Sequence, residues 1–317
     1  MAMPKAKILR QRAQASVRDA AYSVRRLVFY HTVLLLALNA LTTLADFLLS
    51  GSIEGTGGLG GLGLRSVLST AQTVLQLVTL LALPFVQAGM VCAAIAIAHR
   101  QEFGPRTLLG GFREFSRVLR YRVLETLIYL VSAIACITVA NQVFMMLPFS
   151  RKFFTLLEGL TQSTQVTDTL LAEFSAAYAP ALVIFGVLFG VLAVFFHYQY
   201  RMGLYLLLLR PNITATGALR GSWNRMKGNK LAMFKLDLSY WWYYLLDVLC
   251  SAVVYLDLFL ELFGVEIPLD DTTRFLVTMT AYTLCQLALY TWMRGTVETT
   301  YVHAYDAIIG SSQYPEE

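Results

Sequence analysis

The chain has 317 residues, of which 57% are hydrophobic and 14% are charged, whereas soluble domains average roughly 45–50% apolar and about 25% charged residues. With a mean hydropathy of +0.58, this composition excludes an ordinary soluble domain and favours a protein that crosses a membrane several times. The net charge of +5 is concentrated between apolar runs, and no basic groove with stacking aromatics is evident, so we do not expect nucleic-acid binding.

Apolar runs divide the chain into a basic beginning, a long membrane domain and a short tail. Residues 1–26 predict a cytoplasmic, basic, amphipathic N-terminal segment, and residues 310–317 predict a cytoplasmic tail. Between them, residues 27–309 contain six apolar runs, each longer than the roughly 20 residues that a bilayer requires. The sequence therefore predicts an all-α, polytopic helical membrane protein with about six transmembrane helices. The predicted spans cover residues 27–49, 67–98, 123–147, 178–209, 233–262 and 274–308.

Three local features in and between these spans carry further predictions. Pro84 lies inside the second run and predicts a kink there. The glycine-rich stretch Gly51–Gly63 predicts a flexible linker, because it lacks the Gly-Lys-Ser/Thr ending of a phosphate-binding loop. The third outer loop is polar, and we expect a short surface helix around Thr167–Ala177.

Basic residues occur in alternate loops. The N-terminal segment and the second and fourth loops are rich in Arg and Lys, whereas the first, third and fifth loops hold only one or two. Basic loops tend to stay in the cytoplasm, so both termini are predicted to be cytoplasmic.

The chain also carries a possible internal repeat. A basic stretch precedes each odd-numbered span, and the even-numbered spans carry Gly89, Gly203 and Gly295 toward their cytoplasmic ends. This pattern predicts three two-helix repeats. The alternative is that any six-span protein with a cytoplasmic N-terminus places positive charge before its odd-numbered spans.

Two segments carry a resemblance to a known family. One is Gly110-Gly111-Phe112 with Phe115 and Leu119 in the second loop. The other, in the fourth loop and fifth span, comprises Ala218, Ser222, Met226-Lys227-Gly228-Asn229-Lys230, Phe234, Leu238-Ser239 and Tyr240-Trp241-Trp242. These segments resemble a bacterial family of integral membrane proteins known as domain of unknown function 975. The resemblance implies a helical fold in a bacterial cell membrane and no particular chemistry. The chain has Met293-Arg294-Gly295 near the place where that family usually has a Pro-Tyr pair.

The last two predicted spans contain polar residues that need a physical reason, because an ionisable residue costs about 2.5–3.5 kcal/mol at the bilayer centre on insertion scales. In both spans these residues recur at intervals of three or four, which places them on one face of a helix. The two stripes include Asp237, Tyr240, Tyr244 and Asp247 in the fifth span, and Tyr290, Arg294 and Glu298 in the sixth. We therefore expect the two stripes to form a substrate-binding site.

The depth of these residues follows from a rise of about 1.5 Å per residue. Asp237 and Arg294 both lie near the cytoplasmic boundary and can pair there. Asp247 lies about 15 Å deeper than Asp237, where no cationic partner is evident, and this isolation favours a proton- or cation-responsive site. Alternatively, the polar side chains simply hold the helices together through hydrogen bonds worth about 0.6 kcal/mol each.

A second candidate surface lies in the fourth loop, because Arg201 to Lys235 includes no acidic residue. Basic residues near a membrane attract anionic headgroups by about 1 kcal/mol each. The predicted lipid-binding residues are Arg220, Arg225, Lys227 and Lys230. Alternatively, they only set the topology and anchor the helix ends.

The sequence offers no recognisable catalytic or metal-binding pattern. All four cysteines lie inside apolar runs and match no zinc spacing, and no Ser-His-Asp order or paired His motif occurs. We therefore expect no enzyme activity, no metal and no cofactor. The sequence favours a small transport or export protein that binds a solute or lipid between helices. The alternative is a non-catalytic scaffold or regulator that binds anionic lipid or a protein partner through its basic loops.

Overall fold

The computed structural model describes residues 3–54, 59–148, 150–162, 168–255 and 270–312, and all regular structure in these ranges is helical. The all-α prediction is therefore confirmed. The helices are α1 (Ala6–Arg18), α2 (Val24–Glu54), α3 (Leu59–Ala98), η1 (Pro105–Leu109), α4 (Gly110–Arg113), α5 (Phe115–Met146), α6 (Ser150–Gln162), α7 (Asp168–Tyr200), α8 (Gly203–Leu209), α9 (Ala215–Met226), α10 (Lys230–Leu238), α11 (Trp241–Ala252), η2 (Val253–Tyr255) and α13 (Asp271–Ser312).

Several of these helices can cross a membrane. In the described ranges, four stretches are both long and apolar enough: Val24–Ala45, Ser69–Ala98, Phe115–Met146 and Ala172–Leu209. They coincide with the first four predicted spans, and the protein is a polytopic helical membrane protein. The stretch Trp241–Tyr255 is apolar but shorter, and α13 is long but carries polar and charged residues. The fifth and sixth spans thus stay predictions.

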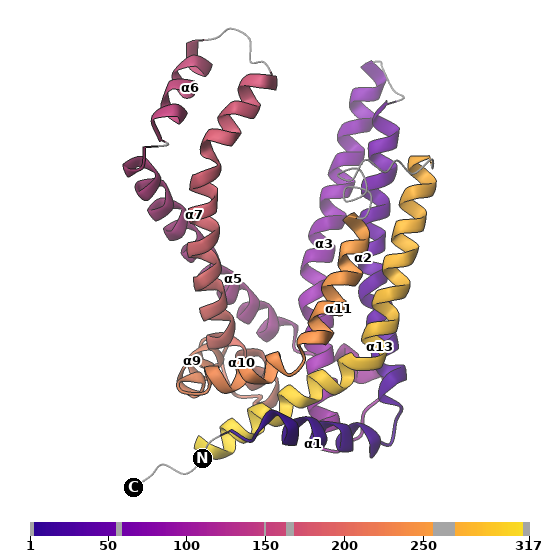
Figure 1. Ribbon diagram of the computed structural model, residues 1–317. Coiled ribbons are helices and arrows are strands. Elements are labelled where there is room, and N and C mark those ends of the chain that lie inside the picture. Colours follow the sequence, from indigo (N-terminus) through magenta and orange to yellow (C-terminus); the bar gives the residue numbers. More distant parts are fainter. Residues whose placement is uncertain (1–2, 55–58, 149, 163–167, 256–269, 313–317) are drawn as a thin grey trace. The chain divides into compact units, whose positions relative to one another are not determined.

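The chain forms two compact units, one made of residues 1–119 and 202–317 and the other of residues 120–201. In the first unit α2, α3, α11 and α13 lie side by side, and α1 packs against the C-terminal part of α13 (Figure 1). Two long-range hydrogen bonds hold α1 there. Nη1 of Arg10 donates to the Ser239 carbonyl at 3.1 Å, and Ser16 Oγ lies 3.0 Å from Nε2 of His303. We refer to the end of the unit where α1 lies as the α1 end.

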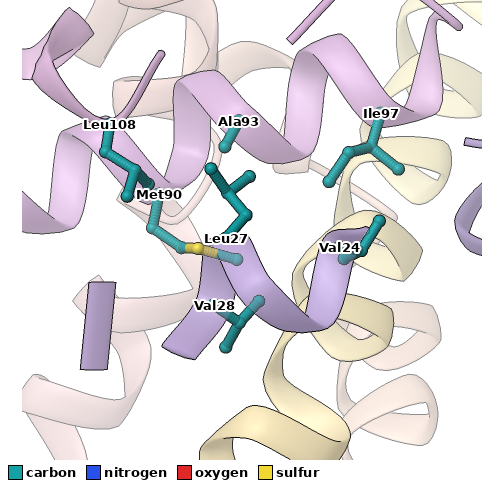
Figure 2. Packing of buried hydrophobic residues seen from close by; sticks show 7 residues of the cluster. All are labelled: Val24, Leu27, Val28, Met90, Ala93, Ile97 and Leu108. Atoms are coloured by element: carbon teal, nitrogen blue, oxygen red, sulfur yellow. The ribbon is translucent and has the colours of Figure 1, made fainter. Parts of the chain in front are cut away.

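A buried core joins α2, α3 and η1 near the α1 end (Figure 2). Its side chains are Val24, Leu27 and Val28 of α2, Met90, Ala93 and Ile97 of α3, and Leu108 of η1. Close backbone contact makes this packing possible. A Cβ atom on Gly89 would lie 1.9 Å from the Leu108 carbonyl oxygen, and one on Gly111 would lie 2.0 Å from the Phe85 carbonyl oxygen. The backbones of η1 and α4 therefore press directly on α3.

The second unit consists of most of α5 together with α6 and α7. The Tyr121 hydroxyl donates to the Tyr200 carbonyl at 3.2 Å, and the Tyr178 hydroxyl donates to Asn141 Oδ1 at 2.8 Å. Phe153 of α6 packs against Phe144 at a centroid distance of 5.7 Å. Hydrogen bonds and ring contacts thus hold this helical hairpin together.

Three local predictions can be compared with the helices. Residues 168–177 are helical, as expected, but they are the first part of α7 and not a separate helix, and Thr167 lies outside the described ranges. The linker expected over Gly51–Gly63 is largely helical, since α2 continues to Glu54 and α3 begins at Leu59, and residues 55–58 lie outside the described ranges. Helix α3 continues through Pro84, and the kink expected there stays a prediction.

Two predicted spans are interrupted. The span 178–209 breaks at Arg201-Met202, between α7 and α8, and the span 233–262 breaks at Ser239-Tyr240, between α10 and α11. At the second break the Ser239 hydroxyl donates to the Leu236 carbonyl at 2.7 Å, while Arg10 satisfies the Ser239 carbonyl. Residues 256–269 of the fifth span lie outside the described ranges.

A side chain outside the helix also satisfies the end of α8. Nη2 of Arg117 donates to the carbonyls of Leu207 and Arg210, each at 2.7 Å, and Nη1 pairs with Glu114 at 2.8 Å. Helix C-terminal carbonyls lack partners within the helix, so Arg117 stabilises the end of this short helix.

The threefold repeat stays a prediction. Gly295 lies in a close helix contact like that of Gly89, since a Cβ atom there would approach Val24 Cγ1 to 2.8 Å. Gly203 is buried at the first position of α8, where the second proposed repeat is interrupted.

The close contact at Gly111 predicts a strong effect of a single methyl group. We expect Gly111→Ala to destabilise the protein by about 1–3 kcal/mol or more, as overpacking does, because the clash is with backbone atoms that cannot move aside. Gly104→Ala is the control, since a Cβ atom there would meet no atom within 4 Å. Thermal unfolding in detergent measures both, and equal melting temperatures for the two variants would contradict the packing.

Candidate functional site

The predicted substrate residue Asp247 lies at the interface between α11 and α13. Its Oδ1 accepts hydrogen bonds from Gln286 Nε2 at 3.1 Å and from the Tyr290 hydroxyl at 2.9 Å. Gln286 Nε2 also lies 3.3 Å from Ser251 Oγ. Both donors are neutral, and among the described residues no Lys, Arg or His forms an ion pair with Asp247. The carboxyl group is thus held by dipoles and has no countercharge.

The predicted residues Arg294 and Glu298 follow on the same face of α13. Nε of Arg294 lies 3.8 Å from Glu298 Oε1, and the guanidinium lies 4.9 Å from the centroid of the Tyr290 ring. A cation over an aromatic face is attracted to the ring quadrupole. Arg294 is therefore linked to Asp247 indirectly, through Tyr290.

Asp237 has a different partner from the one expected. Its Oδ1 accepts a hydrogen bond from the Tyr301 hydroxyl at 2.7 Å, and Tyr301 also bonds to Tyr244. The predicted pair of Asp237 with Arg294 is wrong, because Tyr301 lies seven residues, or about 10 Å, beyond Arg294 along α13. The break at Ser239-Tyr240 separates Asp237 from the stripe on α11, so the spacing of one continuous helix does not apply across it.

Tyr240 completes the contacts near the α1 end. Its hydroxyl lies 2.8 Å from Thr300 Oγ1, and the Arg10 guanidinium lies 5.5 Å from its ring centroid. The ring therefore joins α1, α11 and α13.

These residues form separate polar groups that follow one another along α13, and together we call them the polar ladder. From Gln286 to Tyr301 it extends over 15 residues of α13, or about 22 Å, compared with a hydrocarbon thickness of about 30 Å. The structure thus brings all six predicted substrate residues into one interface, although not in the pairing expected. The ladder consists of Asp237, Tyr240, Tyr244, Asp247 and Ser251 on one side and Gln286, Tyr290, Arg294, Glu298, Thr300 and Tyr301 on the other.

Sequence reasoning missed Gln286 and His31. Gln286 is 2% exposed, and its Oε1 is buried with no hydrogen-bond partner among the described residues. It lies four residues before Tyr290, so the helical spacing of the stripe could have identified it. His31 of α2 is completely buried, with Nε2 3.1 Å from the Val86 carbonyl. Because that carbonyl accepts, Nε2 carries the proton, and the buried Nδ1 is an acceptor without a partner in the described part.

The predicted lipid-binding residues differ in their exposure to solvent. Arg220 and Lys227 are exposed, whereas Arg225 and Lys230 are partly buried. Nη1 of Arg225 lies 3.4 Å from the Gly221 carbonyl, and burial, with Arg210 close by, lowers the pKa of Arg225. Arg225 is therefore directed back onto α9 and is a poor headgroup ligand.

The described residues contain no group of three or more His, Cys, Asp or Glu side chains that could hold a metal ion. The four cysteines are free thiols. The site is therefore composed of carboxyl, hydroxyl, amide and guanidinium groups, and its chemistry is hydrogen bonding and charge.

The register of α11 against α13 can be measured with two native cysteines. Cys250 of α11 and Cys285 of α13 lie close together across this interface. We expect one Hg²⁺ ion to bridge them in the Cys92→Ala, Cys136→Ala background, which native mass spectrometry detects as a single bound mercury and full protection from maleimide. Adding Cys285→Ser should abolish the bridge, and independent labelling of Cys250 and Cys285 after mercury treatment would contradict the register.

Comparison with known proteins identifies a family for this chain and finds no individual protein that matches it. No curated protein and no solved structure significantly matches the chain. The model of a family described as "Protein of unknown function (DUF975)" matches residues 3–290. The matched region contains Asp237, Asp247 and Tyr290, whereas Arg294 and Glu298 lie beyond it. Since the match covers most of the chain, the protein belongs to this family of unknown function, as the resemblance of its loops implied.

Proposed function

We propose that this membrane protein is a transport-type protein, rather than an enzyme, and that it binds a solute or lipid between α11 and α13. The observation that carries the proposal is Asp247, an acidic residue at a helix interface whose hydrogen-bond donors are the neutral Gln286 and Tyr290. A carboxylate in such a place is a strong attractor for a proton or for a cationic or donor-rich ligand.

An unpaired acceptor at the interface supports this ligand chemistry. A purely structural network gains most when every buried polar atom is paired, and an unpaired one costs about 1–3 kcal/mol. Gln286, which donates to Asp247, has a buried Oε1 without a partner among the described residues. This acceptor favours a ligand that supplies N–H or O–H donors.

The polar ladder supports movement as well as binding. It provides hydroxyl, carboxyl and guanidinium groups in close succession from Asp247 to Tyr301, toward the α1 end. We propose that the protein resides in a bacterial cell membrane with both termini in the cytoplasm, so that the ladder connects a site within the bilayer to the cytoplasmic side.

Replacement of Asp247 tests the proposal. We expect wild-type protein, purified in mild detergent, to retain a discrete small molecule that native mass spectrometry detects, and we expect Asp247→Asn to lose it because the amide cannot attract a proton or a cation. Asp19→Asn is the matched control, since it changes the same chemical group at an exposed position outside the ladder.

The variants also separate binding from structure. Protein abundance and thermal unfolding should be unchanged by Asp247→Asn if Asp247 serves a ligand. A large loss of abundance would indicate a structural role, and retention of the molecule in the variant would refute the proposed site.

A second candidate function is a scaffold or regulator that binds anionic lipid through its basic surface. The observation that favours it is the exposure of basic residues on two helices of the first unit. They are Lys5, Lys7, Arg12 and Arg18 at α1, and Arg220 and Lys227 at α9. Each such residue near an anionic surface contributes about 1 kcal/mol.

Charge reversal distinguishes this alternative. We expect the double variant Arg220→Glu, Lys227→Glu to bind anionic lipid about thirtyfold more weakly, given a contribution of about 1 kcal/mol for each basic residue. Arg225→Gln is the control, because its side chain is directed back onto α9 and should contribute little. Equal lipid retention by both variants, measured by lipid mass spectrometry, would count against the basic surface.

A further inference from the structure

A pocket lies between α2 and α13, separate from the hydrogen bonds of Asp247. It has a volume of about 190 Å³, which exceeds the volume of about 150 Å³ at which an apolar cavity takes up benzene. Its lining contains no charged residue. The lining residues are Leu36, Asn39, Ala40, Thr43 and Leu44 of α2, and Phe275, Leu276, Met279, Tyr282 and Thr283 of α13.

The pocket opens within the membrane. All of its α2 residues belong to the apolar stretch Val24–Ala45, which is long enough to cross the bilayer. Leu44 and Leu276 are 45% and 54% exposed, and Ala40 is also exposed. Since hydrocarbon surrounds such a stretch, molecules dissolved in the bilayer can enter from the side.

Polar groups in the pocket lack protein partners. The carboxamide of Asn39 and the hydroxyls of Tyr282 and Thr283 form no hydrogen bond with any residue in the described ranges. Thr42 and Thr43, by comparison, donate to the Asn39 carbonyl at 2.8 and 2.9 Å, which is the usual solution for a helical threonine. An unpaired polar group in hydrocarbon costs several kcal/mol, so the three groups indicate a partner that arrives with the ligand.

We propose that this pocket binds a neutral amphiphile, a lipid-soluble molecule whose apolar chain or ring occupies the cavity and whose hydroxyl, carbonyl or amide group meets Asn39 and Tyr282. The absence of charged residues from the lining excludes an ionic headgroup inside the pocket, since an isolated charge there would be desolvated without compensation. The depth fits as well. Asn39 lies within the apolar stretch Val24–Ala45, so the polar group that meets it must be one that enters hydrocarbon without a charge.

Photolabelling tests the pocket with a defined probe. The probe is a fatty alcohol that carries a diazirine and an alkyne, and the comparison probe is the same hydrocarbon without the hydroxyl. With the full chain in lipid nanodiscs, we expect the alcohol to label peptides that contain residues 36–44 and 275–283. The hydrocarbon should label these peptides less, because it leaves the polar groups unpaired.

Two sets of variants then assign the labelling. Ala40→Trp fills the cavity and should reduce labelling roughly tenfold, because it removes the apolar burial available to the probe. Ala37→Trp, at an exposed position of α2 outside the lining, is the matched control. The double variant Asn39→Leu, Tyr282→Phe retains the cavity and should abolish the preference for the alcohol over the hydrocarbon.

The outcomes separate this proposal from that for Asp247. Asp247→Asn should leave the labelling unchanged, and this result would support the pocket even if the Asp247 site proves structural. Equal labelling of wild type and Ala40→Trp would overturn the proposal, as would equal labelling by the two probes in wild type. A loss of labelling with Asp247→Asn as large as that with Ala40→Trp would also overturn it, because the ligand would then be held at Asp247.

Discussion

The hydrogen bonds that Asp247 accepts from Gln286 and Tyr290 fix α11 against α13, and α13 contacts most helices of the first unit. Helix α13 carries polar and charged side chains along its length, so it cannot face hydrocarbon on all sides, because each unpaired polar group there costs several kcal/mol. It must therefore be surrounded by partners. The positions of α1 and α11 against α13 follow from this requirement, since Ser16, Tyr240 and Asp247 supply polar contacts to α13.

The sequence was sufficient for the helical class and for most residues of the polar ladder, since both follow from periodicity, although Gln286 was missed. The sequence did not predict which residues of the ladder bond to each other. A stripe on a helical wheel assumes an unbroken helix, but Arg10, which is remote in sequence, satisfies the carbonyl at which α10 ends. The resulting break shifts Asp237 to the level of Tyr301. Similarly, the unpaired carboxamide of Asn39 could not be distinguished from a paired one until its surroundings were known.

The residues that resemble the family are explained by packing and turn geometry. Gly111 allows α4 to contact the Phe85 carbonyl, while Phe115 stacks on the Phe85 ring at 4.5 Å. In the other segment Met226 is completely buried, and Gly228 has a φ of +80°, a left-handed conformation that glycine adopts without strain. The Asn229 side chain donates to the Arg225 carbonyl at 2.8 Å. These segments therefore identify a fold, whereas the polar ladder and the pocket are where a ligand is expected.

The contacts of α1 also constrain how the molecule is assembled. Its partners Ser239 and His303 are 229 and 287 residues away in the chain, so α1 packs against segments that are synthesised long after it. These contacts must wait until residue 303 has been made. Until then the apolar face of α1, with the buried Leu9 and Ala13, lacks the helix that covers it. The seating of α1 therefore reports that α13 is in place.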